Sequence, residues 1–148
     1  MKLSKHSGML LLVVLATLVL SGGCMRSTPK ECMQSTPKEL IAQLVSENIY
    51  EVHFGTIQPV ETNVVRAIVQ YGDTAVPFLV DALSSQSPMQ VGYAAYCLNL
   101  MGNYDHKPEA EAALHRFEAK PETEWAYFAI GALKNYLSEF KNYPLEEE

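Results

Sequence analysis

The sequence predicts an all-α fold from residue 36 onward, and three observations support this prediction. Apolar residues recur every three or four positions in six segments, as they do along one face of a helix. Residues that favour the beginnings and ends of helices stand at the edges of these segments. Convincing alternation of apolar and polar residues, which marks a half-buried strand, is missing from this part of the sequence.

Each expected helix is defined by its apolar stripe. In chain order, the six stripes are Leu40, Ile41, Leu44 and Val45; Val64, Val65, Ile68 and Tyr71; Val76, Leu79, Val80 and Leu83; Val91, Ala94, Ala95, Leu98 and Met101; Ala110, Ala113, Leu114 and Phe117; and Trp125, Ala129, Leu133, Tyr136, Leu137 and Phe140. The short connections between several of them favour antiparallel helix pairs.

Two helix starts carry the pattern of a capping box, in which the first and fourth residues bond each other's backbone amides. Thr36 is followed by Pro37 and Glu39, which suit the first and third helical positions. Ser87 and Gln90 repeat this spacing before the fourth stripe. We therefore expect the first helix to begin after Thr36 and the fourth after Ser87.

The remaining boundaries are expected at other residues that cap or break helices. Thr62 is the expected cap of the second helix, Gly72 ends that helix and Gly102 ends the fourth. Pro144 is expected to terminate the sixth.

The helices recur as pairs. Gly72 and Gly102 lie 30 residues apart, and the best offset between the fourth and sixth helices, 35 residues, places Ala94 on Ala129. A period that drifts in this way is typical of helix-pair repeats with connections of variable length.

The central repeat resembles a known family. The segment YGDTAVPFLVDAL at 71–83, followed by VGYAAYCLNLMG at 91–102, closely resembles the short HEAT-like repeat of the PBS-lyase type. The match is firm over 63–102 and extends in partial or degenerate form over 36–141. It implies a short right-handed α-α superhelix of about three helix pairs, with the second helices lining a concave surface. A bundle of unrelated helices is the alternative.

The first 23 residues have the three parts of a secretory signal: a basic start, a 12-residue apolar core and a small-residue step. The last five, Leu20-Ser21-Gly22-Gly23-Cys24, resemble the lipobox of bacterial lipoproteins, which implies that Cys24 carries lipid. An ordinary cleaved signal with a chance cysteine is the alternative. The expected organisation is a signal peptide at 1–23, a lipidated tether at 24–35, a helical domain at 36–141 and an acidic tail at 142–148.

The charged residues limit the classes of molecule that this chain is expected to bind. Without residues 1–23 the chain has 9 basic and 17 acidic residues, a net charge of 9 − 17 = −8. This balance argues against nucleic acid as a partner, because nucleic acid requires clustered basic side chains.

The cysteines do not indicate a disulfide. Once Cys24 is assigned to lipid, Cys32 and Cys97 remain, and we expect both to be unpaired. The sequence has no close grouping of cysteine and histidine, so no metal is expected.

In the HEAT-like register, one set of side chains would lie on the second helices of the pairs, away from the core. Tyrosine and arginine are enriched where proteins bind each other. The candidate partner-binding residues are Arg66, Tyr93, Tyr96, Asn99, Tyr127 and Lys134. The tyrosines could instead fill gaps in a thin core. The long connection at 48–60 is expected to fold back onto the first pair and cap it, with ligand binding as the alternative.

No catalytic constellation is present in the sequence: the histidines are dispersed, and there is neither a GxSxG motif nor a phosphate-binding glycine loop. We therefore expect no enzyme activity and no cofactor. The expected function is that of a lipid-anchored protein-interaction module in the cell envelope. It would face the periplasm from the outer membrane or, in a cell without one, lie on the outer face of the plasma membrane. A ligand-handling or lyase-like accessory protein and a purely structural envelope lipoprotein are the alternatives.

Overall fold

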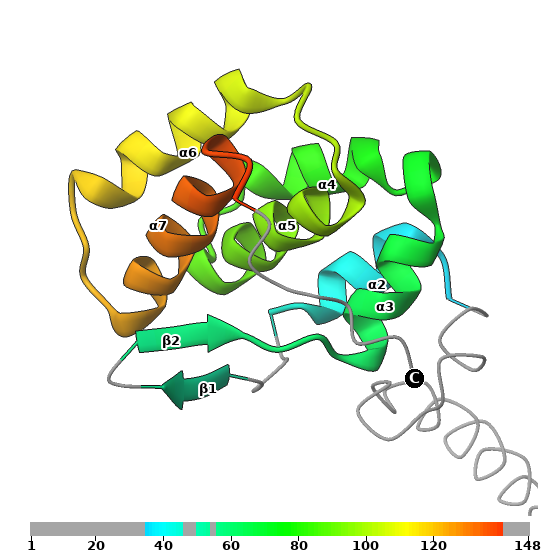
Figure 1. The fold of residues 1–148 in the computed structure, drawn as a ribbon, viewed down its shortest axis with the longest axis horizontal. Helices are drawn as coiled ribbons and strands as arrows, with labels where there is room; N and C mark the ends of the chain where they lie inside the picture. The colour runs from blue at the N-terminus through cyan, green and yellow to red at the C-terminus, as the bar shows by residue number, and fades with distance from the viewer. Residues whose placement is uncertain (1–34, 46–49, 54–55, 141–148) are drawn as a thin grey trace, which may run out of the picture.

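The computed structural model describes residues 35–45, 50–53 and 56–140, and this part of the chain is mostly helical, as predicted (Figure 1). The predicted signal peptide, Cys24, Cys32 and the tail at 142–148 lie outside the described residues. The elements are α2 (Pro37–Gln43), β1 (Tyr50–His53), β2 (Thr56–Pro59), α3 (Asn63–Gln70), the 3-10 turn η2 (Gly72–Thr74), α4 (Val76–Leu83), α5 (Pro88–Met101), α6 (Lys107–Glu118) and α7 (Glu124–Leu137).

The six helices contact one another in a regular pattern. Consecutive helices pack as pairs: α2 with α3, α4 with α5, and α6 with α7. Each helix also contacts the helix two positions later, so that α2, α4 and α6 form one layer and α3, α5 and α7 form another. In Figure 1 the pairs follow one another across the molecule, with α2 and α3 on the right and α6 and α7 on the left.

Helix α5 is the centre of the core. It contacts all five other helices, and its residues from 91 to 99 are buried without exception. A helix that is apolar around its whole circumference is stable only when it is covered on every side. Helix α7 lies especially close to α5 at Gly92. A Cβ atom added to this glycine would lie 2.3 Å from the ring of Phe128 on α7. The glycine thus permits the close approach of these two helices.

One predicted capping box is confirmed, and the other has only one of its two hydrogen bonds. The Thr36 backbone N–H donates to the Glu39 carboxylate (2.8 Å), and the Glu39 N–H donates to the Thr36 hydroxyl (3.3 Å). Ser87 likewise accepts from the backbone N–H of Gln90 (3.4 Å). The Gln90 side chain, however, donates to the Ile41 carbonyl (3.3 Å), which lies in the last turn of α2 and also accepts from the Leu44 N–H (3.2 Å). It therefore joins two helices instead of closing the box.

Helices α5 and α7 end in the same way. Gly102 follows α5 with a φ of 67°, and the Asn103 N–H donates to the Leu98 carbonyl (3.1 Å). After α7, Glu139 adopts a φ of 54°, and the Phe140 N–H donates to the Asn135 carbonyl (2.9 Å). This hydrogen-bond pattern is a Schellman motif. The prediction that the last helix includes Phe140 and runs on until Pro144 is therefore wrong, because the motif ends α7 at Leu137.

A short hairpin in the connection between α2 and α3 was not predicted. Strands β1 and β2 pair antiparallel, with Tyr50 opposite Pro59 and His53 opposite Thr56. We expected this segment to pack on the first helix pair. The helix that β2 mainly contacts is instead α7, the last one (Figure 1). The hairpin connects the two ends of the helical array.

Candidate partner-binding surface

Half of the predicted partner-binding residues lie inside the protein. Tyr93, Tyr96 and Asn99 are 0%, 4% and 5% exposed. The prediction that they form an open surface is wrong, because α5 is covered on the side that an isolated helix pair would leave open. Tyr93 packs against Phe128 of α7, with the ring centroids 5.3 Å apart. These residues belong to the core.

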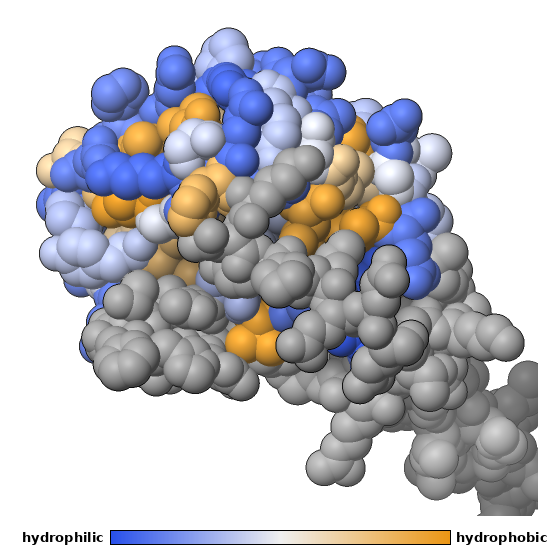
Figure 2. Space-filling view, viewed as in Figure 1, coloured by the Kyte–Doolittle hydropathy of each residue, from blue (hydrophilic) through white to orange (hydrophobic). Residues whose placement is uncertain are grey.

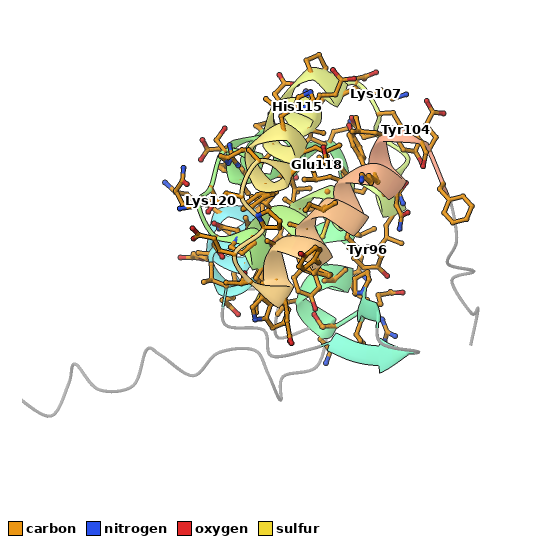
Figure 3. All side chains as sticks on the ribbon, turned by 90° about the vertical axis from the view of Figure 1, so that its left-hand side faces the viewer. Tyr96, Tyr104, Lys107, His115, Glu118 and Lys120 are labelled. Carbon is orange, nitrogen blue, oxygen red and sulfur yellow. The ribbon has the colours of Figure 1, made fainter. Side chains whose placement is uncertain are left out.

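Asn99 has a structural role that its sequence position did not reveal. Its Nδ2 donates to the Phe140 carbonyl (3.1 Å), and its Oδ1 accepts from the Tyr104 hydroxyl (2.9 Å). Burial, and then the nearby Glu139 carboxylate, raise the pKa of Tyr104, so the hydroxyl stays protonated and remains a donor. The Lys107 ammonium, which lies 6.0 Å from the Tyr104 ring, opposes this shift (Figure 3). The network fastens the residues after α7 onto α5.

The other three predicted residues are exposed but do not form one cluster. Arg66 lies on α3 and pairs with Glu61 (3.0 Å). Lys134 lies on α7 and pairs with Glu118 of α6 (2.8 Å), which Figure 3 labels. Tyr127, also on α7, is 63% exposed and is the most exposed large apolar side chain in the described part of the chain. Tyr127 and Lys134 thus share a helix with each other but not with Arg66.

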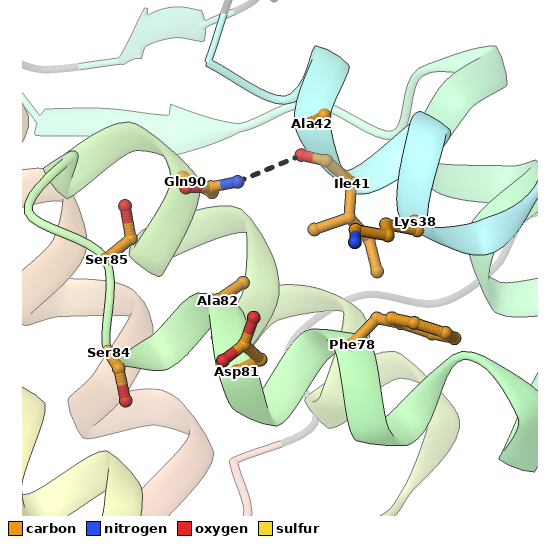
Figure 4. A pocket seen from close by; sticks show the side chains of 9 residues that line it. All are labelled: Lys38, Ile41, Ala42, Phe78, Asp81, Ala82, Ser84, Ser85 and Gln90. Carbon is orange, nitrogen blue, oxygen red and sulfur yellow. Dashed lines mark hydrogen bonds between the residues drawn. The ribbon is translucent and has the colours of Figure 1, made fainter.

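A groove lies between α2 and α4 in the other layer (Figure 4). Its volume is about 340 Å³, within the size range of small binding sites. Its walls are mixed: four apolar residues are combined with two serines, one glutamine, one cation and one carboxylate. The lining residues are Lys38, Ile41, Ala42, Phe78, Asp81, Ala82, Ser84, Ser85 and Gln90. We call this feature the α2–α4 groove.

The groove exists because α4 turns only one face to the core. Val76, Leu79 and Leu83 are buried, whereas Phe78 and Asp81 lie between them in sequence and point outward. Phe78 remains 38% exposed, so part of its ring is accessible from the groove. Its position off the buried stripe of α4 was the sequence signal that could have identified this surface.

A second hollow lies on another side of α4. It has a volume of about 600 Å³ and is lined by α4 and by the connection between α5 and α6. The residues that line it are Asp73, Val76, Pro77, Val80, Asn103, Asp105 and His106. Helix α4 is therefore flanked by two depressions, and the second has carboxylates but no lysine or arginine in its lining.

Arg116, which sequence reasoning overlooked, holds the α4 end of the groove in place. From α6, its Nη2 donates to the carbonyls of Leu83 (2.8 Å) and Ser85 (3.0 Å). A cation at the end of a helix stabilises the carbonyls that lack helical partners. Arg116 thus fixes the turn that forms one edge of the α2–α4 groove.

The outer surface of α6 is polar. Glu109, Glu111, His115 and Glu118 are all exposed along it. In Figure 2, hydrophilic side chains gather along the upper edge of the molecule, where α6 lies. Such a helix face is typical of a surface exposed to water, so α6 is a weaker candidate for a contact surface than α4.

The described residues offer no arrangement for metal binding, since no three histidine, cysteine, aspartate or glutamate side chains come together there. Cys97 is fully buried, and burial raises the pKa of its thiol to about 12, so the reactive thiolate is absent near neutral pH. Within the same part of the chain, no helix has the length and apolar character needed to cross a bilayer.

Comparisons with protein families, with curated proteins and with solved structures found no match for this chain.

Proposed function

We propose that this chain is a membrane-anchored lipoprotein whose helical domain is a non-enzymatic protein-interaction module in the cell envelope. The lipid would be attached to Cys24, at the end of the lipobox-like sequence. The residues that follow would act as a tether between the membrane and the domain. A net charge of 9 − 17 = −8 after residue 23 favours a protein partner over nucleic acid.

We further propose that the helices form a short right-handed HEAT-like solenoid of three pairs. The support is the contact pattern, in which helices pack within consecutive pairs and against the equivalent helices of the next pair. Stacked repeats share a continuous core through contacts of this kind. The central position of α5 fits this arrangement, because the middle pair of three has neighbours on both sides.

The observation that carries the proposed function is the α2–α4 groove. It offers an exposed aromatic ring, Phe78, beside the charged side chains of Lys38 and Asp81. Aromatic anchors with polar groups at the rim are typical of protein–protein interfaces. The proposed contact surface is therefore formed by the first helices of the pairs and not by the second helices.

Site-specific photocrosslinking tests this surface. A benzophenone amino acid replaces Phe78 in the full-length protein, and native membranes are irradiated and analysed by mass spectrometry. The matched control carries the same group at Glu111, an exposed position on α6. We expect one discrete adduct with an envelope protein from position 78 and none from position 111. Equal labelling at both positions, or no adduct from position 78 in correctly localised protein, would contradict the proposal.

A separate experiment tests the anchor. Cys24→Ser should abolish the incorporation of labelled palmitate and release the chain from the membrane fraction. The wild-type chain, labelled in parallel, provides the comparison. Retention of the variant in the membrane fraction at the wild-type level would show that the lipid on this cysteine is not what holds the protein there.

A further inference from the structure

The exposed face of α7 has a glycine at its centre. Glu124, Tyr127, Gly131, Lys134 and Ser138 recur at intervals of three or four residues and are all exposed. They form one stripe along the helix and its C-terminal cap. We call these five residues the α7 stripe.

Gly131 has no reason within the described chain to be a glycine. A glycine inside a helix is less stable than alanine there, because its backbone loses more conformational freedom. Gly92 is explained by the ring of Phe128, which would clash with a Cβ atom. A Cβ atom built on Gly131, by contrast, meets no heavy atom within 4 Å. The space that this glycine leaves open faces outward, where it allows another backbone to approach closely.

The α7 stripe is complementary to a second copy of itself in the antiparallel direction. Glu124 and Ser138 each lie seven residues from Gly131, so an axis at the glycine places the carboxylate of one copy opposite the hydroxyl of the other. Tyr127 and Lys134 lie four and three residues from Gly131, so each exposed ring would lie within one residue, about 1.5 Å along the helix, of the lysine of the other copy, a distance that the long lysine side chain can span. A parallel arrangement would instead place lysine opposite lysine.

We propose that α7 is a homodimer interface in which two copies pack their α7 stripes antiparallel across Gly131. An interface with a twofold axis uses the same patch on both subunits, as this pairing does. The pair between Lys134 and Glu118 is compatible with it, because both side chains stay partly exposed and the cation can contact a carboxylate and a ring together.

The dimer would leave the α2–α4 groove accessible, because the groove and the stripe are formed by different helices. If the proposed function is correct, each dimer has two lipid anchors and two grooves. Two anchors hold a protein to a membrane far more firmly than one. Two grooves would also raise the apparent affinity for a partner with two binding segments.

Cysteine crosslinking in membranes tests the interface. Glu124→Cys and Ser138→Cys, which the pairing places opposite each other, are made together in the full-length chain with Cys32→Ser, so that Cys97, which is buried, is the only other thiol without lipid. A mild oxidant should convert most of this variant into a disulfide-linked dimer. The control is Glu111→Cys in the same background, on the exposed face of α6. A disulfide-linked fraction no larger than that of the control, or an adduct with a different protein, would overturn the proposal.

A second variant separates dimerisation from folding. Tyr127→Ala removes an exposed ring, so its thermal unfolding at high dilution should match that of the wild type. The dimer loses two ring–cation contacts, and its dissociation constant in detergent should rise about tenfold or more. Analytical ultracentrifugation measures this change. An unchanged dissociation constant, or a wild-type protein that stays monomeric at all concentrations, would refute the interface and leave the crosslinking test at position 78 unaffected.

Discussion

The close approach of α5 and α7 makes a strong prediction about Gly92. In Gly92→Ala the new methyl group would lie 2.3 and 2.6 Å from two carbons of the Phe128 ring. Carbon atoms in contact normally lie about 3.5–4.0 Å apart. The ring would therefore have to move by roughly 1 Å or more, or the two helices would have to separate.

Two opposing terms set the size of the effect. Alanine is favoured over glycine inside a helix by about 1 kcal/mol. Overpacking a core costs about 1–3 kcal/mol, and this site belongs at the upper end of that range. Phe128 is 3% exposed and is held by Tyr93 and Trp125, whose ring centroids lie 5.3 and 5.9 Å away. We expect Gly92→Ala to destabilise the domain by about 1–2 kcal/mol.

Urea unfolding followed by circular dichroism at 222 nm measures this difference. Gly131→Ala is the matched control, because it makes the same chemical change in the partner helix with open space around the new methyl group. It should stabilise the monomeric domain by up to about 1 kcal/mol. Phe128→Leu combined with Gly92→Ala should be more stable than the sum of the two single changes predicts, because the smaller side chain makes room for the methyl group.

A Gly92→Ala variant that is as stable as the wild type, or more stable, would contradict this prediction. That result would mean that α5 and α7 are farther apart than described. A double variant whose stability equals the sum of the single effects would show that the methyl group does not meet Phe128 at all.

Three further predictions concern the core and the end of α7. Asn99→Ala should destabilise the domain by about 1–3 kcal/mol in urea unfolding, because it removes two hydrogen bonds and leaves the Phe140 carbonyl without its donor; a loss below 0.5 kcal/mol would argue against the network. Burial raises the pKa of the Cys97 thiol from 9.0 to about 12. Above pH 9 the thiol therefore ionises in the unfolded chain but not in the folded one. The contribution of Cys97 to the free energy of unfolding is complete below pH 9 and falls by about 1.4 kcal/mol per pH unit above it. Cys97→Ala should remove that part of the slope between pH 9 and 11, and identical slopes would contradict the burial. Glu139→Gly should be more stable than Glu139→Ala by about 1 kcal/mol in thermal unfolding, because both lose the carboxylate but only glycine accepts a φ of 54° without strain; equal stabilities would refute a left-handed residue here.

Much of the helical structure was predictable because its signals are local. Thr36 and Glu39 lie three residues apart and bond each other, and Thr62 bonds the amide of Val65. Gly102 ends α5 through its own backbone conformation. The hairpin was missed because each of its strands has only four residues, too few for a clear alternating pattern.

The predicted surface failed for a different reason. When α5 is considered with one partner helix alone, its register predicts Tyr96 and Asn99 on the side that faces away from the core. Their burial depends on segments far along the chain, such as Phe140, whose carbonyl binds a side chain 41 residues earlier. The apolar circumference of α5 pointed to complete burial. The sequence did not show which segment would supply the cover.

The position of the hairpin also affects how the domain unfolds. In an open array of repeats, each unit contacts only its neighbours, so one end can unfold while the other persists. Here β2, from the connection within the first pair, lies beside α7 of the last pair. The ends of the array consequently depend on each other, and unfolding should occur as a single transition.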